Sequence, residues 1–344
     1  MGLFSVGSAS ASPRLASEPR APHPSAPIPV QGPPLGRGVR TVLGESGLSV
    51  FPLIVGGAEF GWHVDLESSH AILDAYVELG GNAVHTSDAH SSGRSEHIIG
   101  QWIHSRGLRD DLVVAVRIGA HPDHPGLGPV NLVRAVESSL TRLRTDRIDM
   151  LYLDGDADGG GTALEDALAT VEWLIEAGKV RALGVFGFTA PQLVEARILS
   201  SAGLPRVTAL DVPYNLLRRD EFEGDLRLVA GAQGIAVTPS QALAHGFLSG
   251  RHRSRARAGA SVRGAQLAAS MNRRGTRMLR AVDALGTELG VSDAAVALAW
   301  LLAQKTVVAP IVNVYSPTHV EELVQGVGVK LGRSQLAELA RAAG

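Results

Sequence analysis

The chain has 344 residues and almost balanced charge, with 32 Lys and Arg against 34 Asp and Glu. The net charge of −2 gives no reason to expect binding to nucleic acid or to a membrane surface. Without cysteine the chain forms no disulfide, thiolate zinc site, iron–sulfur cluster or cysteine nucleophile, which fits a cytoplasmic protein.

The first 40 residues differ in composition from the rest. They hold eight of the 18 prolines, interleaved with Ala, Ser and Arg. Such a segment buries too little apolar surface to offset the entropy of ordering it, so we expect a disordered extension over 1–40. It lacks the features of a secretion signal, and no later stretch is apolar for the length of a membrane span. We therefore expect one folded domain over 41–344.

Within that domain, short β-branched runs alternate with segments of helical period. The predicted strands are Phe51–Val55, Ala83–Thr86, Leu112–Arg117, Met150–Leu153, Ala182–Phe186, Thr208–Val212, Ile235–Thr238 and Val307–Val312. The helical segments between them include Leu66–Leu79, Glu96–His104, Leu132–Leu143, Ala163–Ala177, Pro191–Leu199 and Met278–Leu289. This α/β alternation predicts a single (β/α)8 TIM barrel, with a doubly wound open sheet as the alternative. The long interval before the last strand predicts an insertion over the top of the barrel.

In a barrel the chemistry lies at the carboxyl ends of the strands. His85 and His90 lie at and just after the end of the second predicted strand, Arg117 ends the third and Asp154 follows the fourth. Since these strands are neighbours, the four side chains are expected at one rim, as an acid–base cluster with a fixed cation. A structural ion pair between Arg117 and Asp154 is the simpler alternative, and it does not exclude catalysis.

Several segments carry a resemblance that covers the chain from about Val55 to Leu323. They are Gly93–Glu96, Ser139–Asp149, Gly178–Val185, Pro213–Leu217 and Ala297–Leu302. In order and spacing they resemble the aldo-keto reductase family, in its bacterial and potassium-channel-β-like branch. The resemblance implies the same barrel fold, and an enzyme in which an Asp, a Tyr, a Lys and a His assist reduction of a carbonyl by NADPH.

The positions that match this catalytic set have all changed. The family's Asp and Tyr fall on His85 and His90, its Lys on Arg117 and its His on Asp154. Arg does not release its proton as Lys does, and imidazole titrates near neutral pH where a phenol does not.

The positions that match the family's NADPH contacts have changed as well. The Ser-Asn pair after the fifth strand reads Phe186-Gly187, the Gln of the sixth reads Asp211 and the Tyr of the seventh reads Ser240. The phosphate-binding run reads Asn313–Ser316, and the adenine-contacting Asn reads Leu323. These losses favour an enzyme that works without cofactor, with NADPH as the alternative.

The leading hypothesis is therefore a non-redox enzyme on a small carbonyl metabolite, catalysing dehydration, isomerisation, epimerisation or cyclisation. His85 or His90 would abstract a proton, Asp154 would fix the imidazole tautomer and Arg117 would stabilise the oxyanion. The Ala-, Arg- and Gly-rich composition is typical of GC-rich bacterial genomes, which suggests secondary metabolism. Two alternatives remain: a catalytically silent binding or scaffold protein, and an NADPH-dependent aldo-keto reductase with a rewired active site.

Further residues are expected to bind the substrate from their places after the strands: Glu59, Phe60, Trp62, Asp88, Phe186, Asp211 and Tyr214. No metal is expected, because the histidines and Asp154 lack the spacing of a known metal motif. The Arg-rich stretch 251–257 either grips a phosphate or is a mobile insertion. The expected partner is a small molecule, and homo-oligomerisation is left open.

Overall fold

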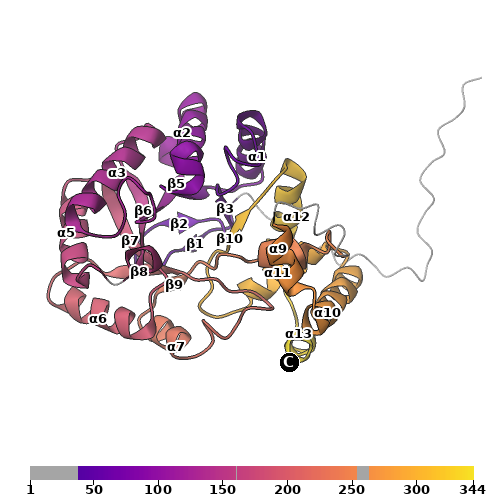
Figure 1. The fold of residues 1–344 in the computed structure, drawn as a ribbon. Helices are drawn as coiled ribbons and strands as arrows, with labels where there is room; N and C mark the ends of the chain where they lie inside the picture. Colours follow the sequence, from indigo (N-terminus) through magenta and orange to yellow (C-terminus); the bar gives the residue numbers. More distant parts are fainter. Residues whose placement is uncertain (1–37, 160, 254–262) are drawn as a thin grey trace, which may run out of the picture. The chain divides into compact units, whose positions relative to one another are not determined.

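Eight parallel strands form the centre of the protein in the computed structural model, which describes residues 38–159, 161–253 and 263–344 (Figure 1). Their order in the sheet is β10-β3-β4-β5-β6-β7-β8-β9. The strands are β3 (Ile54–Gly56), β4 (Ala83–Ser87), β5 (Val113–Ile118), β6 (Ile148–Asp154), β7 (Val180–Phe186), β8 (Val207–Asp211), β9 (Ala236–Val237) and β10 (Ile311–Asn313).

The two ends of this sheet are joined by backbone hydrogen bonds. Val237 of β9 donates to Thr306, and Val308 donates back to Val237, just before β10 begins. Ile311 of β10 donates to Pro239. The sheet is thus closed on itself, and the predicted (β/α)8 barrel is confirmed.

Alanines make up much of the barrel interior and leave room for the ring of Tyr152. The alanines at 83, 115, 182, 209, 236 and 309 belong to one buried cluster with Tyr152. The Tyr152 hydroxyl shares a 2.9 Å hydrogen bond with Thr238, and its ring meets His85 edge-on at 5.7 Å between centroids. Tyr152 therefore lies directly beneath the histidine that sequence analysis placed at the rim.

A hairpin that the sequence analysis did not predict closes the opposite end of the barrel. Strands β1 (Thr41–Val42) and β2 (Ser49–Val50) pair antiparallel. Leu43, Leu48 and Val50 of this hairpin are buried in the same cluster as the barrel interior. Because the amino-terminal end is filled in this way, the open end is the one where the strands finish.

Helices follow the strands and cover the outside of the barrel (Figure 1). They are α1 (Leu66–Glu78), α2 (Arg94–Arg106), α3 (Pro129–Leu143), α4 (Gly155–Asp158), α5 (Leu164–Glu176), α6 (Ala190–Ser201), α7 (Asp225–Ala232), α9 (Gly264–Ser270), α10 (Arg273–Leu289), α11 (Asp293–Leu302), α12 (Pro317–Gly328) and α13 (Arg333–Ala343), with 3-10 turns η1 (His90–Gly93), η2 (Arg109–Asp111) and η3 (Ala244–Ser249). The predicted helices are present, and Asp65 begins α1 by accepting a 2.8 Å hydrogen bond from the Ser68 amide.

Two other predictions concern the amino-terminal extension and the long interval before the last strand. Residues 1–37 of the expected extension lie outside the described residues, so the division at residue 40 stays a prediction. The long interval before β10 contains η3, α9, α10 and α11. Among the described residues, no single helix has the length and hydropathy of a membrane span, and α10 with α11 reaches them only when joined across a 96° bend.

We expect Gly184→Ala to destabilise the barrel. A Cβ at Gly184 would lie 2.6 Å from Cε1 of Tyr152, whose buried ring is held by the bond to Thr238. The free energy of unfolding should fall by about 1–3 kcal/mol, as for other overpacked cores. Urea unfolding followed by circular dichroism measures it. Gly231→Ala on α7 is the control, since its nearest neighbour lies at an ordinary 3.5 Å and the change should be neutral or stabilising. Equal stability of both variants would contradict the packing argument.

Candidate active site

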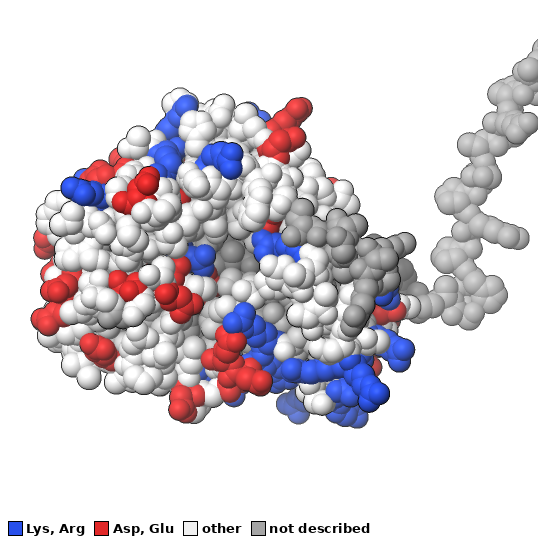
Figure 2. Space-filling model, in the orientation of Figure 1, with Lys and Arg blue, Asp and Glu red and all other residues white. Residues whose placement is uncertain are grey.

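A cavity of about 830 Å³ opens at the carboxyl ends of the strands. Its inner end is lined by His85 of β4, Arg117 of β5, Phe186 of β7 and Asp211 of β8. Its outer end is lined by η3 and by the segment that leads into α12. Figure 2 shows a hollow on this face, with Lys and Arg atoms beside it. The volume falls in the range of small-molecule and cofactor sites.

Arg117 is fixed at the inner end between two carboxylates. Its Nε lies 3.3 Å from Oδ2 of Asp154, and its Nη1 lies 3.9 Å from Oδ2 of Asp211. The guanidinium carbon lies 4.2 Å from the centre of the Phe186 ring. In the sheet, Phe186 is paired with Asp154 on one side and Asp211 on the other. The strand register therefore places one cation over the middle of three neighbouring strand ends.

One cation does not satisfy two buried carboxylates. Burial raises the pKa of Asp211 to about 6, even though Arg117 and a hydrogen bond with Ser240 act in the opposite direction. Burial also raises the pKa of Asp154, and Arg117 offsets this in part. Asp154 has a further partner, because its Oδ1 accepts a 3.0 Å bond from the Ala157 amide at the start of α4. Asp211 is the more deeply buried of the two carboxyls, and burial is the larger cause of its raised pKa.

The two histidines beside Arg117 are neutral. Burial, the charge of Arg117 and the neighbouring His90 lower the pKa of His85 well below its usual value. Burial and Arg117 lower the pKa of His90 to about 3. The rings lie edge-to-face, 6.4 Å apart. Both imidazoles therefore act near pH 7 as neutral hydrogen-bonding groups and are poor proton acceptors.

Four buried polar atoms on cavity-lining residues have no hydrogen-bond partner among the residues that the structure describes. They are His85 Nε2, His90 Nδ1, Arg117 Nε and Asp211 Oδ1. Buried polar groups are nearly always paired in folded proteins, and exceptions concentrate where a ligand supplies the partner. The inner end of the cavity is thus prepared for a polar molecule.

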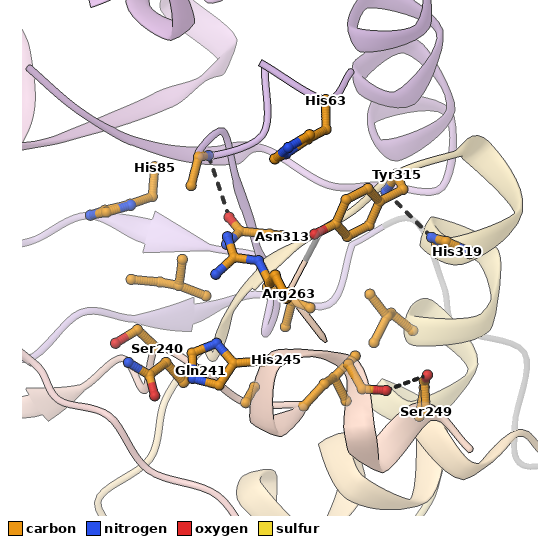
Figure 3. A pocket seen from close by; sticks show the side chains of 18 of the residues that line it. His63, His85, Ser240, Gln241, His245, Ser249, Arg263, Asn313, Tyr315 and His319 are labelled. Atoms are coloured by element: carbon orange, nitrogen blue, oxygen red, sulfur yellow. Dashed lines mark hydrogen bonds between the residues drawn. The ribbon is translucent and has the colours of Figure 1, made fainter. Parts of the chain in front are cut away.

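Arginines and a helix N-terminus mark the outer end. Arg263 donates to Oε1 of Glu59, which is fully buried and also bonded to His63 at 2.7 Å. Burial alone would raise the pKa of Glu59, but the bonds from Arg263 and His63 outweigh it and lower the pKa. Arg251 pairs with Glu322 of α12 at 2.7 Å. Figure 3 shows Arg263 beside Asn313 and Tyr315 in the cavity, opposite Gln241 and His245.

The loop that forms one wall of the cavity is strained. Gln241, Ala244 and His245 have φ values of 54°, 48° and 57°, a left-handed conformation that is costly for residues with a side chain. Such strain concentrates at ligand clamps. A further close approach occurs at Gly56, where a Cβ would overlap Oδ1 of Asn313.

The structure brings together only part of the predicted site. The predicted residues that line the cavity are His85, His90, Arg117, Trp62, Phe186 and Asp211. Asp154 does not line it but forms an ion pair with Arg117. Trp62 is 67% exposed and stacks on His63. The residues that do not line it are Glu59, Phe60, Asp88 and Tyr214.

Each of these four is buried in another role. Phe60 packs in the core, and the Tyr214 hydroxyl donates to Glu223 at 2.6 Å while its ring packs on Trp300. Asp88 accepts from the Gly119 amide at 3.2 Å. The Glu59 carboxylate is bonded to the side chains of Arg263 and His63. Their positions after strands suggested the rim, but the side chains point into the body of the protein.

Sequence reasoning missed Arg263, His245, Gln241 and His319, which line the outer cavity. Arg263 follows the Arg-rich stretch, of which residues 254–257 lie outside the described residues while Arg251 lines the cavity. Within the described ranges, no group of three or more His, Asp or Glu is placed to hold a metal ion.

The arginines at the outer end fit the phosphates of a nicotinamide dinucleotide, whereas the positions that match the family's nicotinamide contacts hold Phe186, Asp211 and Ser240. Arg251 and Arg263 supply guanidinium groups, which suit phosphates. Asn313 and Gln241 add carboxamides along the wall, where Gly56 leaves space for Asn313. The unpaired atoms at the inner end then face the part of the cavity left for a substrate.

We expect Asp211→Asn to change how stability depends on pH. A carboxyl whose pKa is raised in the folded state costs stability when it ionises, so wild-type stability should fall as pH rises from about 4 to 6. The variant has no such loss. Its stability relative to wild type should therefore increase by about 3 kcal/mol from pH 4 to pH 8. Urea unfolding at both pH values measures this, and a difference that does not vary with pH would contradict a buried, weakly paired Asp211.

Known proteins resemble this chain along most of its length. It is 29% identical over 332 residues to norsolorinic acid reductase stcV of Emericella nidulans, covering 90% of this chain and 83% of the relative. It is 30% identical over 339 residues to aldo-keto reductase ausK of the same fungus, covering 91% and 83%. A probable voltage-gated potassium channel subunit beta of Oryza sativa subsp. japonica is 27% identical over 299 residues, covering 83% and 90%.

These relatives correct the expected chemistry. The hypothesis of a non-redox, cofactor-independent lyase, isomerase or cyclase is wrong, because relatives aligned over about nine-tenths of the chain are named as reductases and a dehydrogenase. The expectation of no cofactor is wrong for the same reason, and the alternative with NADPH is the better supported one. The geometry gives a physical reason as well, since His85 and His90 have pKa values too low for abstracting a proton near pH 7.

The family match covers the same part of the chain. The model of the aldo/keto reductase family matches residues 52–343, which include every strand of the barrel and the whole cavity. The resemblance drawn from the sequence motifs is thereby confirmed. This protein belongs to the aldo/keto reductase family.

Proposed function

We propose that this protein is an NADPH-dependent reductase that reduces a carbonyl group of a small molecule at the inner end of the cavity. The observation that carries the proposal is the fixed cation at that end: Arg117, held over Phe186 and beside unpaired polar atoms of His85, His90 and Asp211. Two of the fungal relatives are named norsolorinic acid reductase and aldo-keto reductase, and these names support a small-molecule substrate from secondary metabolism.

The chain's residues have separable tasks in this proposal. Arg251 and Arg263 would bind the phosphates of NADPH at the outer end, and bound NADPH supplies a hydride. Arg117 would stabilise the negative charge that develops on the carbonyl oxygen, since its guanidinium is always charged and already oriented. Asp154 would hold Arg117 in place. His85 and His90, as neutral donors, would orient the carbonyl group.

The remaining predicted residues support these tasks, some from the cavity wall and some from the protein around it. Glu59 would orient Arg263 through their ion pair, and Trp62 with Phe186 would supply apolar walls for the substrate. Phe60, Asp88 and Tyr214 would keep the surrounding loops in place through packing and hydrogen bonds.

We expect Arg251→Gln to weaken NADPH binding about tenfold, because a charged hydrogen bond to phosphate contributes about 1.5–3 kcal/mol. Quenching of tryptophan fluorescence during NADPH titration measures it, with Trp62 at the cavity as reporter. Arg106→Gln is the matched control: Arg106 is also partly exposed and paired, with Asp74, but lies outside the cavity. A wild-type protein that binds no NADPH at millimolar concentration would refute the proposed function.

We expect Arg117→Lys to lower kcat for carbonyl reduction about 100-fold while the Kd for NADPH stays within twofold. Lysine keeps the charge but is a point charge that does not span two carboxylates or stack on Phe186. NADPH absorbance during turnover of a panel of aldehydes and ketones measures kcat. Arg181→Lys, at a 51% exposed side chain on β7, is the control and should leave kcat unchanged. Wild-type binding of NADPH without any turnover would favour the silent binding protein instead.

A further inference from the structure

Reduction of a carbonyl consumes one proton as well as one hydride, and the groups at the inner end differ in their ability to give it. Arg117 does not release a proton in proteins. His85 and His90 are neutral, and a neutral imidazole is a very weak acid. Tyr152 lies below His85 with its hydroxyl bonded to Thr238, and burial raises its pKa beyond the usual value. None of these groups is suited to protonate an oxygen near neutral pH.

The two carboxyls differ in how their oxygens are paired. Asp154 uses Oδ2 for Arg117 and Oδ1 for the Ala157 amide. Asp211 has Oδ2 3.9 Å from Arg117 and is hydrogen-bonded to Ser240, whereas its Oδ1 is buried, has no partner among the described residues and belongs to a residue that lines the cavity. If the two carboxyls hold one proton, that proton is more stable on Oδ1 of Asp211 than on Asp154. There the O–H group can donate to a ligand in the cavity.

We propose that Asp211 is the proton donor of the reductase, delivering a proton from Oδ1 to the carbonyl oxygen of the substrate. This inference rests on the proposed function. Bound NADPH would supply the hydride to the carbonyl carbon, and the oxygen that receives the C=O π electrons would take the proton from Oδ1 of Asp211. Asp211 becomes a carboxylate, which Arg117 stabilises, and solvent entering the cavity returns the proton.

The surroundings suit this role at mildly acid to neutral pH. The pKa of Asp211 is affected by Arg117 of β5, Asp154 of β6 and Ser240 after β9. The charge of Asp211 in turn raises the pKa of Tyr152. Arg117 and Ser240 favour the ionised form, whereas burial and Asp154 favour the protonated form, and the balance leaves a pKa of about 6. A general acid works best when its pKa lies near the working pH.

Two readouts test the proposal on the full-length protein. In the free enzyme labelled with [4-13C]aspartate, the carboxyl signal that is missing from Asp211→Asn should titrate near pH 6. In turnover with NADPH, wild-type kcat/KM, which reports the groups of the enzyme before substrate binds, should decrease above about pH 6. Asp211→Asn should lower kcat about 100-fold and remove that decrease, with NADPH affinity within twofold. Asp211→Glu, which keeps a carboxylic acid at this position, should recover part of the kcat lost in Asp211→Asn and should again lose activity as the pH rises.

Asp154→Asn is the matched control, since it removes the other carboxylate beside Arg117. Asp154→Asn should keep the decrease in activity at high pH but move it to lower pH. The reason is that the pKa of Asp211 falls when the negative charge of Asp154 is removed and Arg117 acts on Asp211 alone. The inference is overturned if the decrease in activity at high pH persists in Asp211→Asn, or if the Asp211 signal titrates near pH 4 like an exposed carboxyl. A wild type with no reduction of any carbonyl would instead overturn the proposed function, and the titration readout separates these two failures.

Discussion

The candidate site depends on one constraint: a single guanidinium serves two buried carboxylates. The register of β6, β7 and β8 brings Asp154, Phe186 and Asp211 side by side, and Arg117 of β5 lies over the aromatic ring between them. The ring gives the cation a flat support, and the two carboxylates hold it from both sides. Because burial makes a second negative charge costly beside one positive charge, the cluster retains a proton at moderate pH.

The same cation determines the state of the histidines. Arg117 and burial together disfavour imidazolium, so His85 and His90 contribute neutral nitrogens. A site with a fixed cation, neutral donors and a protonated carboxyl is suited to activate an electrophile and to protonate an oxygen, and it is unsuited to deprotonate carbon. The residue types alone suggested a base because a free imidazole titrates near pH 7, and only the burial of these rings shows that they do not.

Sequence patterns were sufficient for the barrel but not for the outer site. Alternating β-branched runs and helical segments predicted all eight strands, because each run is short, mostly apolar and mostly buried in the barrel. They did not predict the β1–β2 hairpin, whose strands have two residues each. They also missed the ion pair between Glu59 and Arg263, which joins residues 204 positions apart. Phe60 and Tyr214 were misplaced at the rim, since position after a strand does not reveal which way a side chain points.

The two ends of the cavity differ in charge in a way that orients an elongated ligand. The outer end has one arginine for each carboxylate, because Arg251 pairs with Glu322 and Arg263 with Glu59, and these guanidinium groups suit phosphate. At the inner end two carboxyls surround Arg117, so the net charge there is zero or negative and a phosphate is disfavoured. A molecule with phosphates at one end and a neutral reactive ring at the other is therefore bound in one direction. That direction brings its reactive end toward Arg117 and Asp211, so the charge distribution that selects the ligand also aligns it with the groups proposed for the chemistry.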